Sequence, residues 1–209
     1  WILFIDSDTQ VDSPHFVSNY LNATKEHPAD VYYGGMKNTK ECPKGCELRW
    51  TYETGAARRL TVPYRQAHPF DSLTTQNFMI RRDAFVQTGF DENIRQYGYE
   101  DTLLFANLER LGKSVCHLEN RLVHLDIDTN KKFLAKTREA LRTLHSLPEE
   151  KWPNIKFTNL YFKLRKYKMH RIVSLMHILL LPITRRILCS RFACIKLFQI
   201  YKIGYFCGL

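Results

Sequence analysis

The chain opens with the stretch WILFIDSDTQ, residues 1–10, in which five apolar residues are followed by two carboxylates one residue apart. The run Trp1–Ile5 does not alternate with polar residues, which predicts a strand that is buried on both faces. Side chains two apart in a strand point the same way, so we expect Asp6 and Asp8 to share a ligand. Carboxylate oxygens suit Mg²⁺ or Mn²⁺, and a plain polar turn is the alternative.

The elements predicted after this strand indicate an α/β fold. Ser13 and Pro14 are typical of a helix start, and apolar positions from Phe16 to Thr24 give that helix one apolar face, which includes Val17 and Leu21. A second strand is predicted at 31–36, and the order strand, helix, strand favours a parallel sheet. Further on, the pattern predicts helices near 48–59 and at 82–88, 100–111 and 131–147, and strands at 77–80, 114–118 and 121–124.

The positive charge of the chain is concentrated at its end. The formal net charge is +10, and residues 151–209 contain twelve Lys or Arg and no Asp or Glu. Residues 1–150 carry 19 basic and 21 acidic groups, so they are close to neutral. A basic segment of this kind predicts an anionic partner, either a membrane surface or nucleic acid.

The stretch Ile172–Thr184 is the most apolar part of the basic segment. Its thirteen residues are fewer than the roughly 20 that a membrane span needs, and Pro182 interrupts it. Basic residues around an apolar stretch suit a segment that lies in the membrane interface, and a helical hairpin packed on the core is the alternative. We expect a domain at 1–147 and a basic, apolar helical tail at 148–209 that binds an anionic membrane surface and no nucleic acid.

The two cysteines of the stretch Cys42-Pro-Lys-Gly-Cys46 are compatible with a bound metal or with a disulfide. No matching second pair of cysteines stands nearby, so the spacing favours reduced thiols in a turn.

Two further groups of residues have the chemistry of a site. The stretch from Tyr97 to Asp101 (YGYED) places acidic residues in the first turn of a helix, where the helix dipole favours their charged form. Gly98 would let another molecule approach the backbone, and the tyrosine rings would stack on a sugar. His124 ends an apolar strand, where a histidine is usually just packed; as a metal ligand it needs the carboxylates nearby.

Together these motifs resemble a family 2 glycosyltransferase of the GT-A type, with a galactosyltransferase-like C-terminal half. The resemblance covers about residues 1–147 and also includes 130–144, which is similar to the helix after the histidine in many Bacteroidetes members. It implies a partial GT-A sandwich of α/β class with a mixed sheet, followed by the helical tail. The residues that carry it are Ile5–Asp8, Asn77–Arg82, Gly89–Glu92, Tyr97–Asp101 and Val123-His124.

The resemblance implies a role for each residue at a matching position. Asp6 and Asp8 would bind the donor, and Asp8 would be the more direct metal ligand of the two. His124 would complete a site for Mn²⁺ or Mg²⁺. Asp101 would be the catalytic base, and Glu100 would contact the acceptor. The other acceptor-site residues would be Tyr97, Tyr99, Asn77 and Asp91.

The implied reaction is the metal-assisted transfer of a sugar, with inversion, from a nucleotide-diphosphate donor to a saccharide or lipid-linked acceptor hydroxyl. Such acceptors imply a cytoplasmic protein that is peripheral on the inner face of the cytoplasmic membrane. In the family, further strands and helices precede the aspartate pair, so we expect the sequence to be truncated at its N-terminus and weakly active. Equal activity of the chain and of an N-terminally restored version would contradict this expectation.

Two alternatives stay open. A haloacid-dehalogenase-like phosphatase also opens with an apolar strand and two aspartates, but it has Thr or Val where this chain has Gln10. An assay with a generic aryl phosphate would test that class. The other alternative is a decayed or partial enzyme that acts as a basic membrane-binding module through residues 151–209.

Overall fold

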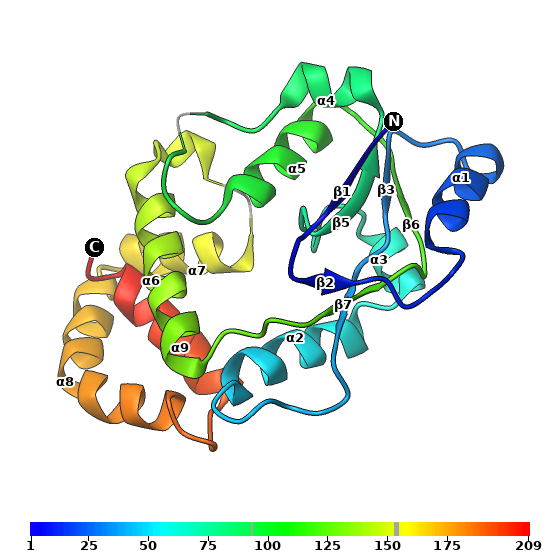
Figure 1. Ribbon diagram of the computed structural model, residues 1–209. Coiled ribbons are helices and arrows are strands. Elements are labelled where there is room, and N and C mark those ends of the chain that lie inside the picture. Colours follow the sequence, from blue (N-terminus) through cyan, green and yellow to red (C-terminus); the bar gives the residue numbers. More distant parts are fainter. Residues whose placement is uncertain (93, 153–154) are drawn as a thin grey trace. The chain divides into compact units, whose positions relative to one another are not determined.

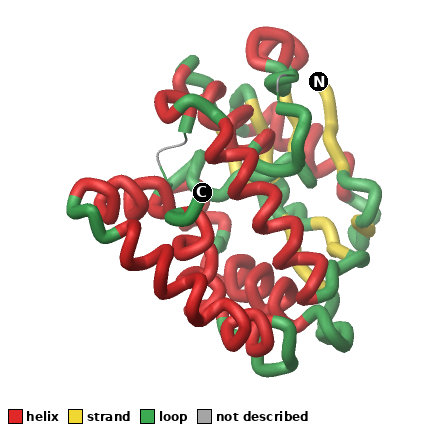
Figure 2. The backbone as a smooth tube through the Cα atoms, turned by 90° about the vertical axis from the view of Figure 1, so that its left-hand side faces the viewer, coloured by secondary structure: helices red, strands yellow, loops and turns green. Residues whose placement is uncertain are grey.

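The structure is a computed structural model that describes residues 1–92, 94–152 and 155–209. The chain divides into two compact units, and all strands of the described residues belong to the first (Figures 1 and 2). We call them unit 1 and unit 2. Unit 1 comprises Trp1–Glu41, Glu53–Asp91 and Glu100–Asp126, and unit 2 comprises Cys42–Tyr52, Glu92–Tyr99 and Ile127–Leu209.

Unit 1 is built on a four-stranded sheet with the order β1-β5-β3-β6. Strand β5 runs antiparallel to both of its neighbours, whereas β3 and β6 are parallel. The expected mixed sheet is therefore confirmed. The expectation of a parallel sheet is wrong, because β5 lies between β1 and β3 and runs antiparallel to both. The bounds are Ile2–Ile5 for β1, Asn77–Ile80 for β5, Val31–Tyr33 for β3 and Val115–His117 for β6.

Strand β1 is an edge of this sheet and is only half-buried. Trp1 is 52% exposed, and Ile5 at the other end is also exposed. Ile2 and Phe4 pack against the core cluster on one face of the sheet, and Leu3 packs against the cluster on the other. The expected burial on both faces is wrong, because an edge strand has a neighbouring strand on one side only and its side chains are incompletely covered.

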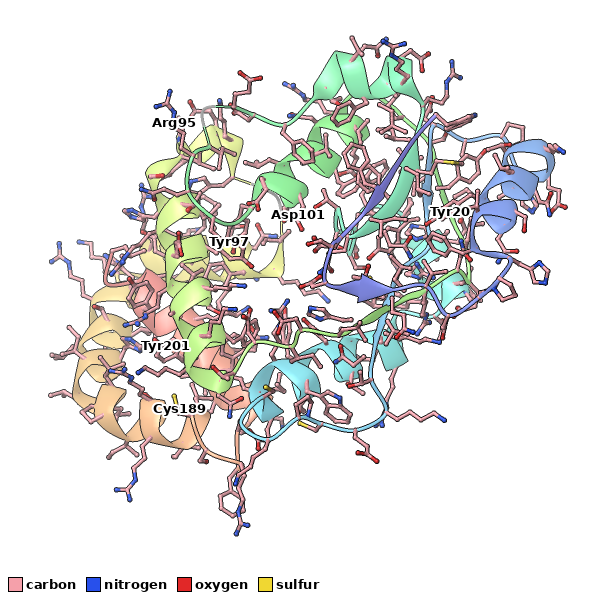
Figure 3. All side chains as sticks on the ribbon, viewed as in Figure 1. Tyr20, Arg95, Tyr97, Asp101, Cys189 and Tyr201 are labelled. Atoms are coloured by element: carbon pink, nitrogen blue, oxygen red, sulfur yellow. The ribbon has the colours of Figure 1, made fainter. Side chains whose placement is uncertain are left out.

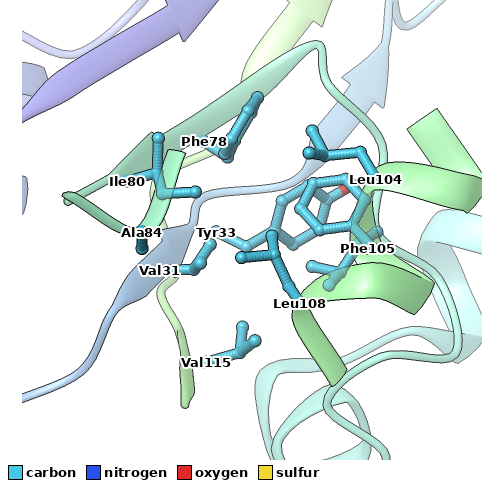
Figure 4. Packing of buried hydrophobic residues seen from close by; sticks show 10 residues of the cluster. Val31, Tyr33, Phe78, Ile80, Ala84, Leu104, Phe105, Leu108 and Val115 are labelled. Carbon is cyan, nitrogen blue, oxygen red and sulfur yellow. The ribbon is translucent and has the colours of Figure 1, made fainter. Parts of the chain in front are cut away.

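Each face of the sheet has its own core cluster. One face packs against helices α4 (Arg82–Thr88) and α5 (Glu100–Arg110), and Phe78 meets Phe105 edge to face at 5.3 Å between ring centroids (Figure 4). The other face packs against helix α1 (Phe16–Glu26). Helices α4 and α5, both predicted from the sequence, therefore cover one face of the sheet, and α1, also predicted, covers the other.

Helix α1 begins later than the sequence predicted. Ser13 forms a turn whose carbonyl accepts from the N–H of Phe16, so it is not the residue that caps the helix. The buried residues of α1 are Phe16, Tyr20 and Ala23. Val17 and Leu21, which were expected to face inward, are exposed because the face of α1 that meets the sheet is centred on Tyr20.

Helix α5 buries most of the leucines that the pattern assigned to its inner face. Leu103, Leu104 and Leu108 are buried, as expected. Leu111 is exposed, so this part of the prediction is wrong. The helix ends at Arg110, so Leu111 lies beyond its last turn, and Gly112 with φ +66° then redirects the chain.

A second, smaller sheet of unit 1 carries His124. Its order is β2-β7-β4, with β7 antiparallel to β2 and parallel to β4. The single strand expected at 31–36 is therefore two strands in different sheets, because Gly35 with φ +82° turns the chain between them. The bounds are Thr9–Gln10 for β2, Leu122–His124 for β7 and Met36–Asn38 for β4.

Gly34 has no room for a side chain. A Cβ atom there would overlap Asn120 O and would lie 2.5 Å from Asn77 Nδ2. We expect Gly34→Ala to lower the free energy of unfolding by about 1–3 kcal/mol or more, because the atoms it meets are backbone and a buried amide.

Gly55→Ala is the matched control for this substitution. Gly55 lies in helix α2 (Glu47–Arg59), and apart from that helix's own backbone no described atom would lie within 4 Å of a methyl group there. We expect this variant to gain about 0.5–1 kcal/mol, since alanine favours a helix. Urea denaturation followed by circular dichroism measures both variants, and equal stability of the two would contradict the prediction.

Unit 2 is built from helices. Leu134 of α6 packs with residues of α8 and α9, and Leu141 and Leu144 pack around Phe206 of α9. The buried leucines of α6 were expected, and they hold α6 to the C-terminal helices, so that α6 belongs to unit 2. The elements are α6 (Asn130–Ser146), η1 (Glu149–Lys151), α7 (Lys156–Lys166), α8 (His170–Leu188) and α9 (Ile195–Phe206).

Helices α8 and α9 pack side by side as a helical hairpin, in orange and red in Figure 1. This hairpin was one of the two expectations for the apolar stretch. Among the described helices, none combines the length and the apolarity that crossing a bilayer requires. Cys42 and Cys46 stand on either side of a turn without a disulfide between them, and the Cys46 thiol donates to the carbonyl of Ile127 at 3.2 Å.

Candidate functional site

The two aspartates of the opening stretch lie in a turn that joins the two sheets of unit 1. Strand β1 ends at Ile5, and the Thr9 hydroxyl donates to Asp6 O at 2.6 Å. The Asp6 side chain is exposed, and Asp8 is half-buried. The alternation of side chains along a strand does not apply to Asp6 and Asp8, because β1 ends at Ile5. A shared ligand stays a prediction.

The structure brings Asp8 and His124 together. Thr9 pairs with His124 across β2 and β7, and Leu125 N–H donates to Asp8 O at 2.9 Å. His124 is 1% exposed, and its Nε2 lies 3.2 Å from Asp8 Oδ2. The small sheet thus fixes the backbone on both sides of this contact. The carboxylate that His124 needed nearby as a metal ligand is in place.

Glu53 of helix α2 is a third member of this cluster, and the sequence reasoning missed it. Its Oε2 lies 3.0 Å from His124 Nδ1, so the imidazole bridges two carboxylates. The helix is anchored beside the small sheet because Asn38 Nδ2 donates to Thr54 Oγ1 at 3.1 Å. No local motif marks Glu53, which lies 71 residues from its partner in the sequence.

The donor atoms of this cluster fit a divalent cation. Asp8 Oδ1 is buried and has no hydrogen-bond partner among the residues that the structure describes. A carboxylate oxygen and His124 Nε2 are both ligands for Mn²⁺, and Glu53 would hold the opposite ring nitrogen, as carboxylates do beside metal-bound histidines. No group of three or more described His, Cys, Asp and Glu side chains has the arrangement of a metal centre. A cation held by Asp8 and His124 would take its other ligands from a substrate or from water.

Asn77 is the first residue of β5 and organises that end of the large sheet. It is completely buried, and its Nδ2 donates to Gly35 O at 2.7 Å and to Asn120 O at 2.9 Å. Its Oδ1 accepts from the hydroxyl of Tyr20 at 2.6 Å (Tyr20 is labelled in Figure 3). The amide is used within the protein, where Asn77 holds the loops after β3 and β6.

Helix α5 begins with two acidic residues. Asp101 Oδ1 accepts from the N–H of Thr102 at 2.6 Å and from its hydroxyl at 3.2 Å (Asp101 is labelled in Figure 3). Burial raises the pKa of the Asp101 carboxyl above its ordinary value; the Thr102 N–H opposes this rise and the charge of Glu100 adds to it. Glu100 Oε2 is buried without a hydrogen-bond partner in the described part of the chain, so it can accept from a ligand hydroxyl.

Asp101 lies near the end of the large sheet at which β1 and β3 finish. Its charge helps to raise the pKa of Tyr33, the last residue of β3, after the larger effect of burial. Ile5, at the end of β1, pairs with Asn77 in the same region. The carboxyl ends of parallel strands are where α/β folds bind ligands. Asp8 and Asp101 therefore both lie toward the end of the large sheet at which β1 and β3 finish, and this end suits a binding site.

Arg65 is a buried cation at this edge that the sequence did not single out. It lies on α3 (Val62–Ala67), a helix absent from the sequence prediction, and its guanidinium lies 5.3 Å from the ring centroid of Tyr33. Its Nη2 donates to Leu118 O at 2.8 Å, while its Nε has no partner among the described residues. Burial lowers the pKa of Arg65 from its ordinary value.

The loop with the two tyrosines belongs to unit 2. Gly98 has φ +109°, and a Cβ atom there would lie 2.6 Å from the Cα atom of Ala140 in α6. The expectation that Gly98 opens the backbone to another molecule is wrong, because α6 fills that space. Tyr97 is exposed, with Lys136 Nζ 5.6 Å from its ring centroid, and Tyr99 packs against the helical core (Tyr97 is labelled in Figure 3). Their sugar-stacking role stays a prediction.

Asp91, the remaining acceptor-site candidate, follows helix α4 and is half-buried. A hollow of about 860 Å³ is lined by residues such as Trp1, Asp30 and Arg81. These residues lie at the start of β1, before β3 and after β5, which is the opposite edge of the large sheet. None of the candidate site residues lines this hollow, so it is separate from the cluster around His124.

No protein-family model matches the chain, and neither a curated protein nor a solved structure matches it.

Proposed function

We propose that the protein is a metal-assisted, inverting glycosyltransferase of the GT-A type, similar to family 2, that uses a nucleotide-diphosphate sugar. The observation that carries this proposal is the contact between Asp8 and His124, beside a buried carboxylate oxygen that has no partner among the described residues. The acidic start of α5 at the same edge of the large sheet supports it. The acceptor would be a saccharide or a lipid-linked sugar at the inner face of the cytoplasmic membrane.

Asp8 and His124 would hold a divalent cation, with the exposed Asp6 as a further carboxylate. When bound, such a cation supplies positive charge that neutralises the departing diphosphate. Glu53 Oε2 lies 3.0 Å from His124 Nδ1, and by accepting from that nitrogen it would orient the ring with its Nε2 toward the cation site. Arg65 adds a fixed positive charge at the same edge.

Asp101 would take the proton of the acceptor hydroxyl as its oxygen attacks the anomeric carbon. The bond from that carbon to the diphosphate oxygen breaks on the opposite face, so the anomeric configuration inverts. A carboxylate with a raised pKa is a better base near neutral pH than an ordinary aspartate. Glu100 Oε2 would accept from an acceptor hydroxyl, and Asn77 and Asp91 would complete the part of the acceptor region that unit 1 supplies.

Calorimetric titration of the full-length protein with UDP and GDP, with and without Mn²⁺, tests this proposal. We expect nucleotide binding that requires Mn²⁺ and that is at least about tenfold weaker in Asp8→Asn. Glu53→Gln should weaken the binding of Mn²⁺ by about 10–100-fold, since it removes only the support of His124.

Asp12→Asn is the matched control, because Asp12 lies after β2 and forms a surface ion pair with Lys37 at 2.6 Å. It should bind like the unmodified protein. Binding that ignores Mn²⁺, or that is unchanged in Asp8→Asn, would contradict the proposed site. A screen of nucleotide sugars then identifies the donor, and hydrolysis of an aryl phosphate in its place would favour the phosphatase alternative.

A further inference from the structure

Helix α8 turns its more apolar face away from the rest of unit 2. Five apolar residues, two of which are adjacent, recur every three or four positions, so they share one face of the helix. Each is between 49% and 63% exposed. We call this set the outward face of α8, and it consists of Ile172, Leu175, Met176, Leu179 and Ile183.

The opposite face of α8 is fixed against α9. A Cβ atom on Gly204 would lie 2.7 Å from His177 Cβ, and one on Gly208 would lie 2.9 Å from Ser174 Oγ. The ring of His177 also meets Tyr201 edge to face at 5.2 Å between centroids. Because the two helices touch so closely, α8 cannot turn about its axis to bury the outward face on α9.

Cations stand at both ends of the outward face. Arg171 lies in the first turn of α8, and Arg185 and Arg186 lie in the last; all three are exposed. Residues 151–209 contain no Asp or Glu, so the positive charge of this part of the chain is not balanced within it. An apolar strip between arginines is complementary to a surface that offers hydrocarbon and phosphate together.

We propose that the outward face of α8 lies in the interface of an anionic bilayer, with the helix axis parallel to the membrane plane. The apolar side chains would enter the boundary between headgroups and acyl chains, and the arginines would pair with lipid phosphates. This surface does not involve the cluster around His124, so the inference stands apart from the proposed catalytic function.

A second copy of the chain is a poorer occupant of this face. Two copies that met through it would bring their arginines together, and residues 151–209 supply no carboxylate to separate them. An anionic lipid surface provides the missing negative charge.

Co-sedimentation with vesicles of phosphatidylcholine, with and without phosphatidylglycerol, tests this inference. We expect the protein to bind the vesicles that contain phosphatidylglycerol, and to bind them less at high salt. The double variant Leu175→Glu/Leu179→Glu should bind at least tenfold less. Both positions are exposed, so the variant should keep its circular dichroism spectrum and its Mn²⁺-dependent binding of UDP.

The matched control is Val17→Glu/Val86→Glu, which adds the same two charges at exposed apolar positions of unit 1. It should bind vesicles nearly like the unmodified protein. Arg185→Gln/Arg186→Gln should reduce the preference for phosphatidylglycerol. Equal vesicle binding by the Leu175/Leu179 variant and its control would overturn the inference. A second result would also overturn it. In that result the unmodified protein does not bind vesicles but forms a dimer without lipid, as seen by sedimentation equilibrium, and only the Leu175/Leu179 variant loses the dimer.

Discussion

Replacing Asp101 by asparagine should lower the turnover of sugar transfer by about 10²–10⁴-fold, the usual contribution of a positioned acid–base group. Asparagine keeps an oxygen that accepts from Thr102, so the start of α5 should remain intact. It cannot take the acceptor proton. Mn²⁺-dependent binding of UDP should be unchanged, because Asp8 and His124 are untouched. Steady-state kinetics with the donor found by the screen measures the loss.

The same variant should not lose stability at neutral pH. Burial raises the pKa of Asp101, so its charged form destabilises the folded state at pH values above that pKa. This destabilisation disappears as the pH falls below the pKa of the unfolded chain. Asp101→Asn removes it, and the free energy of unfolding at neutral pH should therefore rise or stay equal. The acid limb of the pH–rate profile of the unmodified enzyme should lie above the ordinary aspartate value of 3.8.

Asp83→Asn is the matched control for the kinetic prediction. Asp83 also lies in the first turn of a helix, α4, but it is exposed and pairs with Arg81 at 2.6 Å. Its replacement should leave turnover unchanged. Retained turnover in Asp101→Asn would remove this residue from the role of base, whatever the fate of the cation site.

Phe78→Ala should lower the free energy of unfolding by about 3–5 kcal/mol. Phe78 lies on β5, which has a strand on either side, and it is completely buried. Its ring stacks on Phe4 at 4.6 Å and meets Phe105 edge to face (Figure 4 shows Phe78 and Phe105). Truncation therefore leaves a cavity at the centre of a cluster and removes two ring contacts.

A loss of this size is a large part of the 5–15 kcal/mol that typically holds a protein folded. Val86→Ala is the control, since Val86 is 75% exposed, and it should change stability by less than about 0.5 kcal/mol. Guanidinium denaturation followed by circular dichroism measures both. A loss below about 1 kcal/mol would show that the cluster can close around the gap.

The elements that the sequence predicted well are those with strong local signals. The leucine spacing of α6 and most of that of α5 marks their buried faces, and the glycine after each of α4 and α5 marks where those helices end. The short apolar runs that end near His117 and His124 likewise predict β6 and β7. In each case the signal that predicts the element lies within a few residues along the chain.

The parts that the sequence did not reveal depend on distant contacts. Nothing near β5 indicates that it inserts between β1 and β3, because strand order is set by packing on both faces of the finished sheet. The bridge from Glu53 to His124 joins residues 71 positions apart. Gly98 has the local appearance of a ligand contact, and only the position of Ala140 shows that a helix of the same chain fills the space.

The close packing of α8 on α9 affects the entropy change when α8 binds a surface. Amphipathic segments that are disordered in water give up conformational freedom when they become helical on a partner, and this loss weakens their attachment. Helix α8 is already helical and packed against α9, with Gly204 and Gly208 allowing the close approach and the leucines of its outward face exposed. Attachment would therefore carry little ordering entropy, and the helix content of the chain would be the same whether or not lipid is present.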